Sequence, residues 1–218
     1  MKAVIAAGGA HAPADRLVLG GADLVIAADG GADWLDRVGH RPDRVVGDLD
    51  SADPALVGRL ADAGVPVDRH PPDKDASDLE LALAIAVEAR ADEVVVLGGL
   101  GGALDHLAAN LMLLGSSLAS GRRMSLALGP TTARMLAGPA LADLSGAPGS
   151  RVTLLAVGGP ADGVTTRGLR WPLADARLEM GSSLGLANEV AEPPAEVSVR
   201  AGRLLVIEIA PDGEEVPE

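Results

Sequence analysis

The sequence predicts an α/β fold: an N-terminal doubly wound, mostly parallel α/β domain over residues 1–129, followed by a small C-terminal antiparallel β-sandwich over residues 130–218. Before residue 130, short runs rich in Val, Ile and Ala alternate with longer segments of helical periodicity. After residue 130, strand-like runs are broken by Gly and Pro and show little helical period. Every His and Lys precedes residue 130, so we expect the chemistry to lie in the first domain.

The first half should form five strands, at 3–7, 23–28, 44–47, 93–98 and 123–129, with helices at 32–39, 54–64, 77–90 and 103–115. The strand runs are apolar without polar alternation, which is typical of a parallel sheet covered on both faces. In such sheets ligands bind outside the carboxyl ends of the strands.

The second half should form strands at 151–157, 163–171, 195–202 and 203–209. Short strands separated by turn residues favour a sandwich or a small barrel. The acidic end, residues 211–218, is expected to fray.

Composition excludes several function classes. The chain has 218 residues, of which 48% are hydrophobic, so it should be globular. It contains no apolar run of the ~20 residues that span a bilayer, and "MKAVIAAGGA" is typical of a first strand rather than a signal peptide. Without Cys there is no disulfide or thiolate metal site, and the cytoplasm is the expected location. A net charge of −13 argues against nucleic-acid and membrane partners, so a phosphate ligand would need a divalent cation.

Carboxylates and glycines follow the ends of several predicted strands. These residues are Asp29, Gly30 and Gly31; Asp48 and Asp50 in "GDLDS"; Gly98, Gly99, Gly101 and Gly102, then Asp105; and Asp75 and Asp78 at a helix start. Hard oxygen ligands in this pattern suit Mg²⁺. The convergence predicts a site for Mg²⁺ and a polyphosphate.

Structural explanations exist for individual members of this set. Ser77 and Glu80 have the spacing of a capping box, and Asp78 in the first turn suits the helix dipole. The glycine loop fits neither the P-loop nor the Rossmann spacing. Trp34 should lie in the core, and the four His lack metal-ligand spacing.

Several motifs together resemble the thiamine pyrophosphokinase family. They are "AADGGADWL", "RPDRVVGDLDS", "DKDASDLELAL", "LGGLGGALDH" and "GLRWPLADARLEMGSSLGLANEV", in that order over nearly the whole chain. The resemblance implies a catalytic α/β domain and a thiamine-binding, dimerising β-sandwich. It also implies a homodimer with thiamine bound where the subunits meet, and transfer of pyrophosphate from ATP to the thiamine hydroxyl with release of AMP.

Residue by residue, the resemblance implies Mg²⁺ ligands at Asp48, Asp50 and Asp78, with Asp105 and Asp75 as acidic partners. It implies nucleotide contacts at Asp29, Gly30, Gly31, Ser77 and the glycines of 98–102, and thiamine contacts at Trp171, Ser182, Ser183 and Asn188. Lys74 could neutralise a phosphate oxygen, and Asp105 or Asp75 could accept the hydroxyl proton. Since Pro172 follows it, Trp171 should lie at the surface and offer thiamine an aromatic face.

One position departs from the family pattern. Ala103 stands where the family usually has Arg, and Arg122 or Arg123 could supply that charge instead. Two alternatives stay open: a pyrophosphokinase acting on another alcohol, such as a pterin, and a non-catalytic sensor of nucleotide or thiamine.

Overall fold

The computed structural model describes residues 1–211, so the acidic end beyond residue 211 lies outside the described residues. The chain divides into two compact units. The first is Met1–Gly129, and the second begins at Pro130.

The first unit is built around six parallel strands. Its strands are β1 (Lys2–Ala6), β2 (Leu24–Ala28), β3 (Arg44–Gly47), β4 (Val67–Arg69), β5 (Glu93–Leu97) and β6 (Arg123–Leu128). They lie in the order β6-β5-β1-β2-β3-β4, and every neighbouring pair among them is parallel. The chain moves outward from β1 on one side and returns to β5 on its other side. This change of direction creates a crevice beside β1, at the carboxyl ends of the strands.

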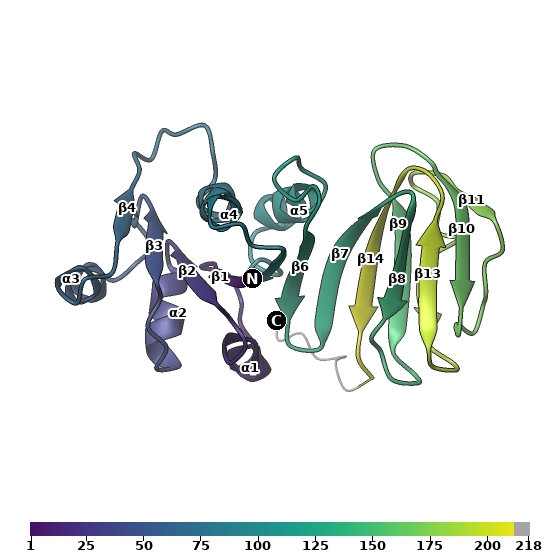
Figure 1. Cartoon of the computed structure of the whole chain (residues 1–218), viewed down its shortest axis with the longest axis horizontal. Coiled ribbons are helices and arrows are strands. Elements are labelled where there is room, and N and C mark those ends of the chain that lie inside the picture. Colours follow the sequence, from purple (N-terminus) through teal and green to yellow (C-terminus); the bar gives the residue numbers. More distant parts are fainter. Residues whose placement is uncertain (212–218) are drawn as a thin grey trace. The chain divides into compact units, whose positions relative to one another are not determined.

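Helices cover both faces of this sheet. They are α1 (Arg16–Leu19), after a 3₁₀ turn at Pro13–Asp15, α2 (Gly31–Arg37), α3 (Pro54–Asp62), α4 (Asp78–Glu88) and α5 (Leu104–Leu113). Figure 1 shows α4 and α5 on one face and α2 on the other. Asp53 caps α3 by accepting a 2.9 Å hydrogen bond from the Ala55 amide. The capping box predicted for Ser77 and Glu80 is present at the start of α4.

The second unit contains two groups of antiparallel strands. One has the order β12-β9-β14-β7, with β7 Thr131–Ala137, β9 Arg151–Ala156, β12 Asn188–Glu189 and β14 Arg203–Ile209. The other has the order β11-β10-β13-β8, with β8 Ala140–Leu144, β10 Ala161–Arg167, β11 Ala176–Leu178 and β13 Ala195–Val199. Buried side chains from both sheets, such as Leu154 and Val197, form one core. The predicted fold class, α/β followed by a β-sandwich, is confirmed.

The sequence pattern missed several strands and the short helix α1, and two of the strands it predicted end earlier than expected, at Arg167 and Val199. It did not predict β4, β7, β8, β11 or β12. The strand expected over 163–171 stops at Arg167, because Gly168 has φ +71° and packs its Cα against the backbone of the segment 192–195. Within residues 1–211, no helix has the length and apolarity needed to cross a membrane.

Candidate active site at the carboxyl ends of the parallel strands

A cavity of about 340 Å³ opens at the crevice beside β1. The loops after β1, β2, β3 and β5 line it, together with the first turn of α4 and the first two turns of α5. The predicted site residues that line it are Asp29, Ser77, Asp78, Gly98, Gly101 and Gly102. Its size is that of a small-ligand pocket.

Glycines allow the loops after β1 and β5 to touch through their backbones. A Cβ on Gly9 would lie 2.3 Å from the Gly98 oxygen, and a Cβ on Gly98 (φ +72°) would lie 2.4 Å from the Ala7 oxygen. Side chains there would separate the loops. Gly31 has a different role, in packing rather than in the loops. A Cβ on Gly31 would lie 1.9 Å from the Ala6 oxygen, so its absence allows α2 to pack on β1.

Three carboxylates converge at this edge of the sheet. Asp29 follows β2, Asp48 follows β3 and Asp78 begins α4, and each offers an oxygen within 4.8 Å of the others. Gly47 makes room for this approach, since a Cβ there would lie 2.9 Å from Asp78 Oδ1. Asp29 adopts φ +48°, an uncommon conformation for a residue with a side chain. Such strain concentrates at functional sites.

Lys74 supplies the positive charge in this cluster. Its Nζ lies 2.9 Å from Asp48 Oδ2 and 3.1 Å from Asp78 Oδ1, and its side chain is only 12% exposed. The hydrogen bond from Lys74 lowers the pKa of Asp48, and the same bond raises the pKa of Lys74. Burial is the main cause that raises the pKa of Asp29, with the charge of Asp78 adding to it.

The donor set fits a hard divalent cation. All three groups are carboxylates, the ligands that Mg²⁺ prefers. Asp78 Oδ1 is buried and makes no hydrogen bond of ordinary geometry, although the Lys74 ammonium lies beside it. A buried carboxylate oxygen that lacks a hydrogen bond still has lone pairs available to ligate a metal ion.

Other predicted catalytic and metal residues lie outside the cluster. Asp50 is exposed and accepts a 2.9 Å hydrogen bond from Ser51 Oγ. Asp75 and Asp105 are also exposed, and Asp105 accepts a bond from the His106 amide. Gly30 is the N-cap residue of α2. The roles predicted for Asp50, Asp75, Asp105 and Gly30 stay predictions.

The residues expected at the thiamine end belong to the second unit. Trp171 is 55% exposed, and the Arg170 guanidinium carbon lies 5.0 Å from its ring centroid. Asn188 is buried. Ser182 is half-buried and accepts a bond from the Leu184 amide, while Ser183 is exposed.

Sequence reasoning missed several residues that line the cavity, among them Gly8, Gly9, His106 and Asn110. Asn110 donates to the Gly99 oxygen over 3.0 Å and so ties α5 to the glycine loop. The one available signal was helical spacing, because Ala103, His106 and Asn110 recur every three or four residues.

The suggested substitutes for an Arg at position 103 are wrong. Ala103 lines the cavity. Arg123 begins β6, at the amino end of a strand, and pairs with Glu93. Arg122 directs its guanidinium to the Leu118 and Ser120 carbonyl oxygens. Among the cavity-lining residues, only His106 can carry a positive charge.

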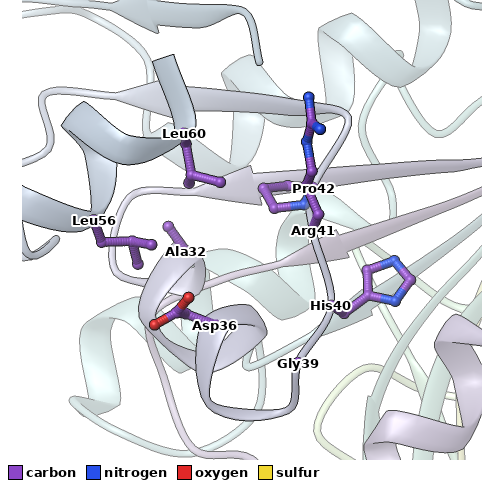
Figure 2. A pocket seen from close by; sticks show the side chains of 8 residues that line it. All are labelled: Ala32, Asp36, Gly39, His40, Arg41, Pro42, Leu56 and Leu60. Carbon is purple, nitrogen blue, oxygen red and sulfur yellow. The ribbon is translucent and has the colours of Figure 1, made fainter. Parts of the chain in front are cut away.

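A second cavity, of about 280 Å³, lies between α2, α3 and the loop before β3. Figure 2 shows Asp36, His40 and Arg41 pointing in different directions there, and not toward a common point. Arg41 donates to the Ala63 oxygen, and Asp36 pairs with Arg59 at 3.6 Å. Two of its charged groups are therefore already engaged.

The fold and the first cavity define a class of two-domain protein, in which an α/β domain with a carboxylate cluster at its strand ends precedes a β-sandwich. Residues 16–126 match the family model for the thiamin pyrophosphokinase catalytic domain, and residues 143–204 match that for the thiamin pyrophosphokinase vitamin B1 binding domain. The chain belongs to the thiamin pyrophosphokinase family, an enzyme family, as the ordered motifs predicted.

Individual relatives agree over most of the chain. Thiamine pyrophosphokinase 2 of rice is 27% identical over 212 residues, covering 86% of this chain and 79% of that protein. The solved structure of thiamine pyrophosphokinase from Bacillus subtilis has a TM-score of 0.85 at 26% identity, covering 96% of this chain and 99% of its own. That from Geobacillus thermodenitrificans has a TM-score of 0.84 at 27% identity, covering 96% and 97%.

Proposed function

We propose that this chain transfers pyrophosphate from ATP to the hydroxyl group of thiamine in a Mg²⁺-dependent reaction, giving thiamine diphosphate and AMP. The single observation that carries the metal-dependent part is the convergence of Asp29, Asp48 and Asp78 at the rim of the cavity. Family membership supports the choice of ATP and thiamine. The absence of Cys from the sequence favours the cytoplasm as the location.

The cluster would hold Mg²⁺ through Asp48, Asp78 and Asp29, with Asp50 as a further candidate at the same turn. A cation there supplies charge neutralisation of the triphosphate and polarises the phosphorus that is attacked. The backbones of Gly98, Gly101 and Gly102 approach the nucleotide closely, since no side chain intervenes.

The chemical step requires little covalent help from the protein. The thiamine hydroxyl oxygen attacks the β-phosphorus, the bond from that phosphorus to the α–β bridging oxygen breaks, and AMP leaves with that oxygen. A carboxylate, Asp105 or Asp75, accepts the hydroxyl proton. Lys74 donates hydrogen bonds to phosphate oxygens, so the work of the site is positioning and charge neutralisation.

We further propose that the second unit receives thiamine and forms the homodimer interface. Trp171 offers an aromatic face to the cationic thiazolium ring. Near it in the sequence, Met180, Leu184 and Leu186 are also exposed, and each has an exposed fraction of 57% or more. Large apolar side chains grouped on a surface mark contact sites. Sedimentation at assay concentration tests the dimer, and an active monomer would refute it.

The test of the activity is AMP formation from ATP with and without thiamine, at saturating Mg²⁺. We expect AMP and thiamine diphosphate in equal amounts, and neither product without thiamine or in the presence of excess chelator. AMP release that a pterin alcohol stimulates, but thiamine does not, would favour the alternative substrate. Binding of ATP or thiamine without any AMP would favour a sensor.

A further inference from the structure

We propose that Lys74 is an exchangeable counter-ion: it pairs with the metal-binding carboxylates until a metal–nucleotide complex arrives, and it then transfers its hydrogen bonds to the phosphates. Binding of the metal ion and the nucleotide is thereby coupled. The inference rests on the proposed function, but its test measures binding and does not depend on turnover.

The geometry places Lys74 in direct competition with a metal ion. Its Nζ contacts Asp48 Oδ2 at 2.9 Å and Asp78 Oδ1 at 3.1 Å, and both residues belong to the carboxylate cluster. Mg²⁺ binds oxygen at about 2.0–2.1 Å, so an ion held by these two oxygens would take the place of the ammonium. Two cations at one position would repel each other strongly. Metal binding therefore requires Lys74 to leave.

The charges decide when Lys74 can leave. A divalent ion that arrives without a nucleotide displaces the ammonium and gives it no new partner. The binding free energy of that ion is therefore reduced by the loss of the two ion pairs of Lys74. An ion that arrives with a triphosphate brings oxygens that accept hydrogen bonds from the displaced ammonium. None of the residues lining the neighbouring cavity is Lys or Arg, so no strong cation of that lining competes with Lys74 for those phosphates.

The position of Lys74 in a loop before α4 allows its side chain to move. Lys74 precedes the capping residue Ser77, so it lies outside α4. Its side chain is flexible, with four rotatable bonds, and its charge is compact. Asp48 and Asp78, by contrast, are fixed at a strand end and at a helix start, which keeps the carboxylates in place while the lysine exchanges partners.

Titration of the nucleotide-free protein with Mn²⁺ tests the competition. We expect Lys74→Met to bind Mn²⁺ about tenfold or more tightly than the unmodified protein, since the loss of charge-assisted contacts on this scale changes affinity by such factors. Lys2→Met is the matched control, because it removes the same charge from the start of β1, where Lys2 faces Glu93 at 4.0 Å. Equal or weaker Mn²⁺ binding by Lys74→Met would overturn the proposal.

A second measurement uses the unmodified protein and stays informative if Lys74→Met fails to fold. Lys2 and Lys74 are the only lysines, so lysine-specific isotope labelling gives two resolvable ε-CH₂ signals in NMR. Saturation with Mg²⁺ and a non-hydrolysable ATP analogue should shift the Lys74 signal and leave the Lys2 signal unchanged. An unmoved Lys74 signal at saturation would contradict the exchange. Failure of the proposed function would appear separately, as absence of thiamine-dependent AMP.

Discussion

The side chain of Asn188 holds the backbone of Trp171 at both of its hydrogen-bonding groups. Asn188 Nδ2 donates to the Trp171 oxygen over 2.6 Å, and Asn188 Oδ1 accepts from the Trp171 amide over 3.1 Å. Asn188 is buried, whereas Trp171 is exposed. The side-chain amide of Asn188 therefore bonds to Trp171 as a neighbouring strand would. These two bonds fix the position of the Trp171 backbone, from which the indole ring projects.

Asn188→Ala should therefore release Trp171 as well as destabilise the protein. Leaving buried backbone groups unpaired costs about 1–3 kcal/mol of unfolding free energy. In a Trp34→Phe background, Trp171 is the only tryptophan and its emission reports its surroundings. We expect a red-shifted emission and a raised KM for thiamine with little change in that for ATP. An unchanged KM for thiamine in Asn188→Ala would show that Asn188 does not contribute to the thiamine site.

The two carboxylates of the "GDLDS" turn should differ in importance. Asp48 belongs to the cluster and pairs with Lys74, whereas Asp50 lies outside the cluster, is exposed and accepts a hydrogen bond from Ser51 Oγ. Asp48→Asn should reduce AMP release about 100-fold or more, since a metal site contributes several kcal/mol to the transition state. Asp50→Asn should reduce it less. The comparison uses kcat at saturating Mg²⁺, and equal losses would place both in the metal site.

Ala103→Arg should strengthen nucleotide binding. Ala103 lines the cavity and caps α5 with an extended backbone that an Arg also adopts. A guanidinium there could make charge-assisted bonds to phosphate, which we expect to tighten binding of an ATP analogue about tenfold. Ala109→Arg is the control, because Ala109 is exposed on the same helix and does not line the cavity. Equal effects of the two variants would indicate general electrostatic attraction.

Gly31→Ala should be among the most destabilising small substitutions in the first unit. Its Cβ would lie 1.9 Å from the Ala6 oxygen, so α2 would have to move away from β1, at a cost of about 3 kcal/mol or more. Gly58 in α3 has open space at its Cβ position, and Gly58→Ala should stabilise by ~0.5–1 kcal/mol. Urea unfolding measures both. A mild Gly31→Ala would show that α2 is not tightly held.

The unfolding free energy should fall as the pH is lowered through the range of His11. Burial lowers the pKa of His11, although its bond to the Ala7 oxygen and the charge of Asp15 oppose this. The unfolded chain therefore binds a proton first, from about pH 6.5 downward, and stability is lost from there to the lower pKa of the folded state. His11→Gln should show a shallower decline than the unmodified protein.

Two further measurements sharpen this prediction. His11 stacks on Trp34, with ring centroids 4.2 Å apart, so emission from Trp34 in a Trp171→Phe variant should change over the same pH interval. His40→Gln removes a ring elsewhere in the first unit and serves as the control. If the unfolding free energy of His11→Gln and of the unmodified protein declined equally with falling pH, groups other than His11 would be responsible for the decline.

Strand and helix patterns predicted the parallel half of the fold because each buried run is long and apolar. β4 has three residues and no fully buried side chain, so it carries no such signal. β7 and β8 are half-exposed, and their pairing depends on partners far along the chain. Trp34 was correctly predicted in the core, but its stacking on His11 joins segments that no local pattern relates.

The site was predicted as a region more accurately than as a set of contacts. Strand ends and one helix start predicted that carboxylates would gather at one edge of the sheet, namely Asp29, Asp48, Asp50, Asp75, Asp78 and Asp105. Of these, the structure brings Asp29, Asp48 and Asp78 together. The separation of Asp48 from Asp50 depends on Leu49, which adopts φ +65° and is buried. The double pairing of Lys74 depends on the path of the loop before α4. Neither is visible in residue spacing.

The residues that line the first cavity extend along the chain from Ala7 to Asn110, so nearly the whole α/β unit must fold before the proposed nucleotide site exists. A ligand that binds only the folded form adds its binding free energy to the unfolding free energy of that entire unit. In a cell rich in nucleotide, this linkage would conceal part of the harm done by mutations far from the cavity. The concentration of nucleotide in the cell would then set how much loss of stability a mutation in the α/β unit can cause before that unit unfolds.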